Sequence, residues 1–155
     1  MKTSTTPNQL KSNLLTTLVL FVLSLTLSVA QTDTKVTTEE GQTITVTIDN
    51  VKNNTGQVVF ALHTKDTWMK GQGVQNTTTT IENNSVTITF TNVQPGTYSI
   101  MALHDVNNNN RMDFENGMPQ ESYGMSNNPM SYGPPQFSEA KFEVTNEDLE
   151  FNIRF

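Results

Sequence analysis

The chain has 155 residues, no cysteine, and 15 acidic residues against 9 basic ones, which gives a formal net charge of −6 at pH 7. An acidic chain does not provide the basic surface that nucleic-acid binding needs, and a chain without cysteine has neither disulfide bonds nor a lipid attached through a cysteine. The length suits one domain.

The first thirty residues have the features of an export signal. Lys2 and Lys11 precede an apolar run from Leu14 to Leu27, and Ser28-Val29-Ala30 follows as a cleavage site with small residues. The run is shorter than the roughly 20 residues that span a membrane, so cleavage is expected rather than a retained anchor or membrane insertion. Removal of residues 1–30 leaves seven basic and fifteen acidic residues, a charge of −8. The sequence therefore predicts a periplasmic or secreted protein.

Residues 31–41 are nearly devoid of apolar side chains and predict a flexible lead-in. From residue 42 onward, several segments alternate apolar and polar residues with a period of two, which is typical of strands with one buried face. The apolar positions of these segments are Ile44, Val46 and Ile48, then Val86, Ile88 and Phe90, and finally Leu149, Phe151, Ile153 and Phe155.

Two other segments, Gln57–His63 and Thr97–His104, are apolar on both alternations and predict central strands covered on both faces. An edge strand at Val74–Ile81, a short strand at Phe142–Val144 and one helical turn at Asp66–Lys70 complete the expected elements. The sequence therefore predicts that residues 42–155 form an all-β domain, an antiparallel β-sandwich of about seven strands.

Residues 105–137 form a long segment, rich in Asn, Gly, Pro and Met, without sustained periodicity. Segments of this length without structure are uncommon in compact domains and are mostly functional or disordered. At its start, Asp105, Asn107, Asn109 and Asp113 place oxygen-bearing side chains at the spacing of a calcium-binding loop. The sequence therefore predicts one long metal-binding loop.

In a twelve-residue loop of the EF-hand type, Asp105, Asn107 and Asn109 take positions 1, 3 and 5, the carbonyl of Arg111 takes position 7, and Asp113 takes position 9. Two positions depart from the pattern: position 6 is Asn110 instead of Gly, and position 12 is Asn116 instead of Glu. Glu115 and Glu121 are possible sources of the missing carboxylate. We expect weak Ca²⁺ binding, with a dissociation constant of roughly 10⁻⁴ to 10⁻³ M. The alternative is an Asn-rich turn that binds no ion.

Two histidines end similar segments, since His63 follows Phe-Ala-Leu and His104 follows Met-Ala-Leu. If the two strands are neighbours, His63, His104 and Asp105 form a candidate site for zinc or copper, in a metal-dependent enzyme or a transition-metal carrier. The alternative is that each histidine binds a loop carbonyl at a strand end. Because the chain has no Cys nucleophile, Gly-x-Ser-x-Gly or His-Glu-x-x-His motif, we expect no enzyme activity.

The long segment also carries several methionines and aromatic residues, namely Met112, Met118, Met125, Met130, Tyr123, Tyr132 and Phe137. Such side chains form either an adaptable binding surface or a small core beneath the segment, and burial is the more usual outcome.

A series of motifs in fixed order resembles the bacterial domain-of-unknown-function family 2141. They are Pro95-Gly96-Thr97-Tyr98, His104-Asp105-Val106-Asn107-Asn108-Asn109, Met112-Asp113, Gly117-Met118-Pro119, Glu121-Ser122-Tyr123-Gly124, Ser126-Asn127-Asn128, Gly133-Pro134-Pro135 and Phe137-Ser138-Glu139-Ala140. The resemblance covers about residues 42–155 and implies a small exported β-sandwich of the transthyretin or carboxypeptidase-regulatory kind. It implies no settled activity. Asn110, Met112 and Ser122 stand where that pattern has Gly, Leu and Gly.

Taken together, the sequence predicts an exported, non-enzymatic calcium-binding domain. We expect a monomer that serves as a binding or accessory module for an unidentified glycan or protein. A purely structural envelope protein without a ligand is the remaining alternative.

Overall fold

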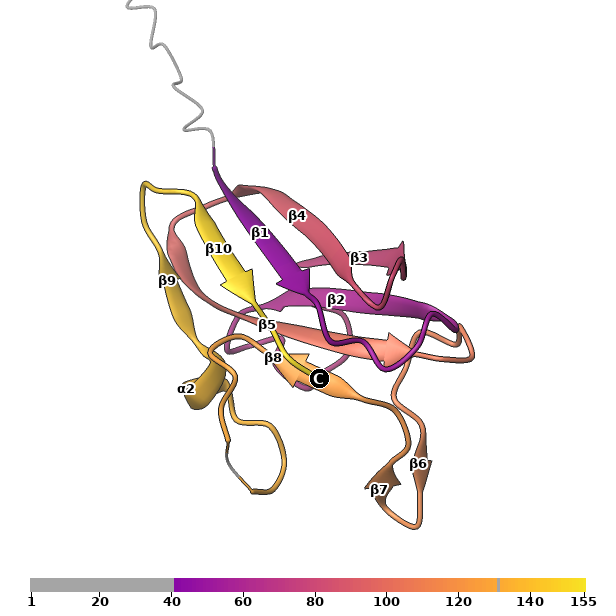
Figure 1. Cartoon of the computed structure of the whole chain (residues 1–155). Coiled ribbons are helices and arrows are strands. Elements are labelled where there is room, and N and C mark those ends of the chain that lie inside the picture. Colours follow the sequence, from indigo (N-terminus) through magenta and orange to yellow (C-terminus); the bar gives the residue numbers. More distant parts are fainter. Residues whose placement is uncertain (1–40, 131) are drawn as a thin grey trace, which may run out of the picture. The chain divides into compact units, whose positions relative to one another are not determined.

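The computed structural model describes residues 41–130 and 132–155, which form an all-β domain (Figure 1). The predicted signal and most of the predicted lead-in lie outside the described residues. Within those residues, no helix has the length and hydrophobicity needed to cross a membrane. The predicted all-β class is confirmed.

The first sheet has the strand order β10-β1-β4, with β1 (Gln42–Ile48) between β4 (Val86–Val93) and β10 (Leu149–Asn152). β1 and β4 are antiparallel, as predicted, but β1 and β10 are parallel. The expectation of purely antiparallel pairing is therefore wrong for this pair. A parallel pair needs a long connection, and here most of the domain lies between the two strands in the chain.

The second sheet has the order β3-β2-β5-β8, and all of its pairs are antiparallel. Its strands are β3 (Gln75–Thr80), β2 (Gln57–His63), β5 (Gly96–Asp105) and β8 (Tyr123–Met125), and β9 (Phe142–Val144) pairs with the first residues of β5. The predicted central strands are β2 and β5, and the predicted edge strand is β3. Full cover on both faces of the central strands was predicted, but most residues on the second face of β2 are only half-buried.

Side chains from both sheets form one hydrophobic cluster. Alternate residues of β1, such as Ile44 and Val46, are fully buried, and so are Val58 and Phe60 of β2. The strands with one buried face that the period-two pattern predicted are therefore confirmed. In the first sheet, one face of β1 and β4 lies against the common core, and threonines cover the opposite face. Slipping β1 by one residue would place threonines in this core, so its register is firmly set.

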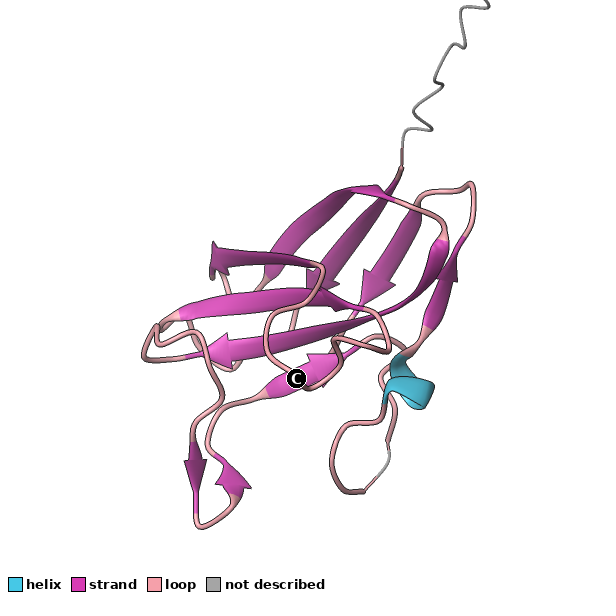
Figure 2. Cartoon of the chain, turned by 180° about the vertical axis from the view of Figure 1, so that it is seen from behind, coloured by secondary structure: helices cyan, strands magenta, loops and turns pink. Residues whose placement is uncertain are grey.

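The long segment after β5 contains more regular structure than its composition predicted. A two-stranded hairpin, β6 (Phe114–Glu115) and β7 (Met118–Pro119), precedes β8, and a one-turn helix, α2 (Phe137–Ala140), precedes β9. Figure 2 shows α2 as the single helix among the described residues. The helical turn predicted at Asp66–Lys70 is instead a succession of turns.

The C-terminal residues connect the two sheets. β10 ends at Asn152, three residues earlier than predicted; the N–H of Ile153 donates to the carbonyl of Thr47 (2.9 Å), and the side chain of Ile153 is fully buried. The N–H of the next residue, Arg154, donates to Oδ1 of Asn128 (2.8 Å). A Cβ atom on Gly124 of β8 would overlap the carbonyl oxygen of Arg154. The chain end therefore lies directly against β8.

This close approach makes Gly124 a sensitive position. Gly124→Ala should destabilise the domain by about 3 kcal/mol, at the upper end of the usual cost of overpacking, because the added methyl group must displace backbone. Gly117→Ala is the comparison, since Gly117 has φ +80° but open space around its Cβ position, and only the backbone cost of about 1–2 kcal/mol applies. Urea denaturation of both variants measures the difference. Equal or smaller destabilisation by Gly124→Ala would contradict the packing described here.

Candidate functional site

The predicted metal-binding loop begins where β5 ends, and its first residue is held firmly. Asp105 is fully buried, and the register of β2 and β5 places it opposite Gln57. Its carboxylate accepts hydrogen bonds from Nε2 of Gln57 (2.8 Å) and from the backbone N–H groups of Asn109 (3.0 Å) and Asn110 (2.8 Å). The loop is therefore folded around the Asp105 carboxylate.

These hydrogen bonds determine the charge state of Asp105. Burial by itself raises the pKa of the carboxyl group, because it disfavours the charged form. The hydrogen bonds from the Gln57 side chain and from the backbone of Asn110, Asn109 and Asn108 favour the carboxylate and together outweigh burial. The pKa of Asp105 is therefore lowered, and the group is a buried anion at neutral pH.

Three further loop side chains converge on one another. Nδ2 of Asn107 lies 2.6 Å from Oδ2 of Asp113, and Nδ2 of Asn109 lies 3.0 and 3.1 Å from the two oxygens of Asp113. Oδ1 of Asn107 accepts the N–H of Asn109 (3.1 Å), and Oδ1 of Asn109 accepts the N–H of Arg111 (2.9 Å). The four predicted side-chain ligands therefore belong to one hydrogen-bonded loop.

The loop bends through residues with positive φ. Asn108 and Asn110 both have φ +61°. Asn tolerates this region better than other residues with a side chain, so Asn110 occupies the position where the EF-hand pattern has Gly. Its Oδ1 also accepts a hydrogen bond from Nε2 of Gln57 (3.0 Å). Gln57 thus links β2 to both ends of the turn, and nothing in its sequence context indicated this, because the contact depends on strand register.

Of the two acidic residues considered for the missing carboxylate, the structure brings Glu121 to the loop. Glu121 is 9% exposed and accepts the N–H groups of Val106 (2.8 Å) and Asp113 (3.3 Å). Glu115 lies on β6 and is exposed. Arg111 is also exposed, and its backbone N–H takes part in the loop through Asn109.

The structure contradicts the geometry assumed for a site of His63, His104 and Asp105. β2 and β5 are neighbours, but they are antiparallel, and His63 pairs with Ser99 while His104 pairs with Val58. Five residues of strand separate the two histidines, about 17 Å. Among the described residues, no group of three or more His, Asp or Glu side chains is placed to hold a metal ion. A cation at the loop would therefore depend on amide oxygens as well as carboxylates.

Each histidine instead binds a loop carbonyl. Nδ1 of His63 donates to the carbonyl of Thr67 (3.1 Å), and burial lowers the pKa of the ring while this hydrogen bond opposes the shift. Nε2 of His104 donates to the carbonyl of Thr55 (2.8 Å), and its ring is stacked on Phe155 with centroids 6.2 Å apart. The histidines hold the loops at opposite ends of the second sheet.

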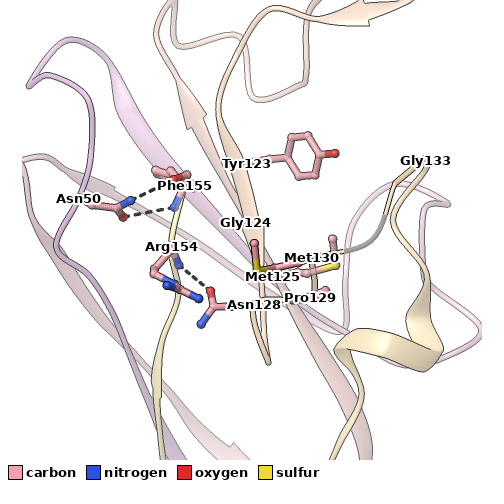
Figure 3. Close-up of a pocket in the computed structure, with 10 residues that line it drawn as sticks. All are labelled: Asn50, Tyr123, Gly124, Met125, Asn128, Pro129, Met130, Gly133, Arg154 and Phe155. Carbon is pink, nitrogen blue, oxygen red and sulfur yellow. Dashed lines mark hydrogen bonds between the residues drawn. The ribbon is translucent and has the colours of Figure 1, made fainter.

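An open pocket of about 500 Å³ lies beside β8 (Figure 3). Consecutive residues of β8 line it together with residues of the following turn and of the chain end: Asn50, Tyr123, Gly124, Met125, Asn128, Pro129, Met130, Gly133, Arg154 and Phe155. The sequence left open whether the apolar residues of segment 105–137 are buried or exposed, and the structure shows both. Met125 is 9% exposed, whereas Met130 is 91% exposed.

The Asp105 carboxylate should make folding stability depend on pH. Because its pKa is lowered in the folded state, its contribution is present above the unfolded pKa of about 3.9 and is lost as pH falls through the folded value. Asp105→Asn should lower the free energy of unfolding at pH 7 by about 1–3 kcal/mol, and the difference from the parent protein should shrink below pH 4. Asp66→Asn, at an exposed position, should have little effect. Denaturation at pH 3 and pH 7 tests this, and a pH-independent difference would contradict it.

Comparisons with known proteins identify the family. No curated protein and no solved structure matches the chain. Residues 46–152 match the family model described as "Uncharacterized protein conserved in bacteria (DUF2141)", and the match includes the loop, Glu121 and β8. As the sequence motifs predicted, the chain belongs to the DUF2141 family.

Proposed function

We propose that the protein is an exported, non-enzymatic calcium-binding β-sandwich domain of the transthyretin-like kind. The observation that supports it is the convergence of Asn107 and Asn109 on the carboxylate of Asp113, beside the buried carboxylate of Asp105. Five oxygen-bearing positions, with the carbonyl of Arg111 as the fifth, then supply the ligands. The two sheets that share one core support the proposed architecture.

The ligand chemistry favours calcium over other metal ions. Carboxylate, amide and carbonyl oxygens are hard ligands, and the loop offers no imidazole or thiolate for zinc or copper. In each of the two Asn amides, the NH₂ group hydrogen-bonds Asp113 and the oxygen accepts a loop N–H. A carbonyl oxygen has two lone pairs, so a cation would bind the second lone pair of each oxygen. Calcium tolerates an irregular shell of six to eight oxygens, whereas magnesium demands a near-ideal octahedron. An Asn-rich loop suits the more tolerant ion.

Glu121 supports the proposal with a carboxylate that lies outside the twelve positions of the EF-hand pattern. Position 12 of the loop is Asn116, which has φ +51° and is the first residue of the turn between β6 and β7. Glu121 approaches instead from beyond the hairpin and accepts two loop N–H groups, so a carboxylate is present at the base of the loop. Asp105 and Asp113 are the anions of the predicted ligand set, and Glu121 adds negative charge at the base of the loop. The proposed affinity remains in the weak extracellular range of about 10⁻⁴ to 10⁻³ M.

The proposed role rests on the predicted export of the chain. The signal-like first thirty residues support a location in the periplasm or outside the cell, and the proposed affinity is typical of extracellular calcium-binding modules. We assign it no catalytic activity. The domain would act as a binding or accessory module for a glycan or a protein partner, as a monomer.

Calorimetry of the purified protein with CaCl₂, after treatment with EGTA, tests the proposal. We expect binding heat in the submillimolar to millimolar range and a rise in melting temperature. Calcium at a hundredfold excess over the dissociation constant corresponds to about 2.7 kcal/mol of added stability. Asp113→Asn and Glu121→Gln should weaken binding at least tenfold, because each removes an anion from the loop.

Glu115→Gln is the matched control, since it removes an acidic charge from the exposed hairpin nearby and should leave calcium affinity unchanged within about twofold. MgCl₂ should produce a smaller shift in melting temperature than CaCl₂. Absence of both heat and thermal shift at 10 mM calcium would reject calcium binding and favour an ion-free structural loop.

A further inference from the structure

The hydrogen bonding of β8 leaves one edge of this strand open. The N–H of His104 donates to the carbonyl of Ser122 (2.9 Å), and the N–H of Ser126 donates to the carbonyl of Ile100 (3.0 Å). In an antiparallel ladder, residues that bond the partner strand alternate with residues whose N–H and C=O point the other way. Since Met101 pairs with Met125 and Leu103 with Tyr123, the backbone groups of Tyr123 and Met125 point away from β5.

β8 is the last strand of the order β3-β2-β5-β8, so no strand of the described residues covers this edge. The carbonyl of Met125 accepts the N–H of Asn128 (3.1 Å). No hydrogen bond within the described residues engages the remaining groups, which are the N–H and C=O of Tyr123 and the N–H of Met125. An open strand edge of this kind is a template for a further strand.

The pocket lies along this edge. Tyr123, Gly124 and Met125 all line it, although alternate side chains of a strand point to opposite faces. A pocket that contacts three consecutive residues therefore borders the backbone of β8 as well as one of its faces. Asn128 and the chain end form its other sides (Figure 3).

The pocket has one positive charge and several apolar walls. Arg154 is exposed, its side chain extends toward Asn128 (Figure 3), and no ion pair within the described residues engages its guanidinium. The rings of Tyr123 and Phe155 and the side chains of Met125 and Met130 provide apolar surface. In a chain of net charge −6, an unpaired guanidinium at a pocket is complementary to a carboxylate.

We propose that the edge of β8 binds an extended peptide of a partner protein by strand addition, with a carboxylate of that peptide bound by Arg154. Main-chain hydrogen bonds to Tyr123 and Met125 supply affinity, and the pocket walls receive alternate side chains. The peptide supplies its carboxylate from its C-terminus or from an acidic side chain. The inference names the partner class of the proposed accessory module, and it does not depend on calcium at the loop.

Two features of the site determine how the partner binds. β8 has three residues, so it pairs with only two or three residues of a peptide, and the expected affinity is micromolar or weaker. Both asparagines of the pocket are already engaged by the chain end, since Nδ2 of Asn50 donates to the carbonyl of Phe155 (2.9 Å) and Nδ2 of Asn128 to that of Asn152 (2.8 Å). The free polar groups are therefore mainly backbone and guanidinium, which suits a peptide better than a glycan.

Fluorescence polarisation of the purified protein with labelled hexapeptides of alternating threonine and valine tests the proposal. The set contains a peptide with a free C-terminus, its C-terminal amide, and an amidated peptide ending in glutamate. The set also contains two N-methylated peptides. One is methylated at the backbone nitrogens of the odd residues and the other at those of the even residues, so that each lacks the N–H groups along one edge of the strand. We expect binding of the carboxylate-bearing peptides, loss of at least tenfold in affinity for one N-methylated peptide, and a change within about threefold for the other.

Arg154→Gln should lower the affinity for the carboxylate-bearing peptides at least fivefold and leave the affinity for the amidated neutral peptide unchanged. Lys65→Gln, which removes an exposed positive charge outside the pocket, is the matched control and should bind all peptides as the parent protein does. Amide chemical shifts of Tyr123 and Met125 should move on titration. These variants alter only exposed side chains, and the N-methylated peptides test strand addition without any variant.

All measurements are made in calcium and in EGTA, so that failure of calcium binding and failure of peptide binding are separate results. No binding of any peptide at millimolar concentration would overturn the inference. An equal loss of affinity with both N-methylated peptides would also overturn it, as would amide chemical-shift changes confined to the opposite edge strand β3. Self-association of the protein through β8 in place of peptide binding would overturn it as well.

Discussion

The antiparallel register of β2 and β5 is the constraint on which the other features depend. It aligns Gln57 with Asp105, and it thereby places a side-chain amide against the carboxylate that starts the loop. The same register sets His63 and His104 at opposite ends of the sheet. Because one face of both strands is buried in the common core, a shift by one residue would expose the apolar set, and the position of the loop is fixed with it.

The buried charge of Asp105 explains why the loop has a definite shape. A carboxylate removed from water is costly unless hydrogen bonds compensate it, and here the compensating N–H groups come from the loop backbone itself. The backbone must therefore curl around the carboxylate, and positive φ at Asn108 and Asn110 permits the turn. A cation at this position would meet a loop that is already folded, so it would change the structure only within the loop, while its binding would still stabilise the folded state.

The sequence predicted the parts of this structure that depend on local pattern. Alternation predicted β1 and β4, the doubly apolar run predicted β2 with its observed bounds, and the oxygen spacing predicted a loop whose side chains converge. Features that depend on contacts between distant segments were not predicted. The parallel pairing of β1 with β10, the role of Gln57 and the separation of the histidines all follow from strand order and register, which a single sequence does not display.

The short hairpin and the end of β10 were also not predicted correctly from the sequence pattern. β6 and β7 have two residues each, too few for a period to be recognised, and the turn between them depends on positive φ at Asn116 and Gly117. β10 was predicted to continue to Phe155 because the alternation continues. The structure ends it at Asn152, since Asn128 binds the next residues and draws the chain toward β8. The apolar pattern records that Ile153 is buried, but it does not distinguish burial in a strand from burial against a neighbouring edge.

The segment 121–125 connects the two proposed sites. Glu121 binds backbone N–H groups at the base of the loop, the carbonyl of Ser122 continues the ladder with β5, and Tyr123 begins the open edge two residues later. A ligand that restrains one end of so short a segment reduces the conformational freedom left at the other end. Any coupling between a cation and a peptide must then be reciprocal, because each ligand changes the affinity for the other by the same factor. The ladder bond between His104 and Ser122 opposes such coupling, since it holds the middle of the segment to β5 whether or not either site is filled.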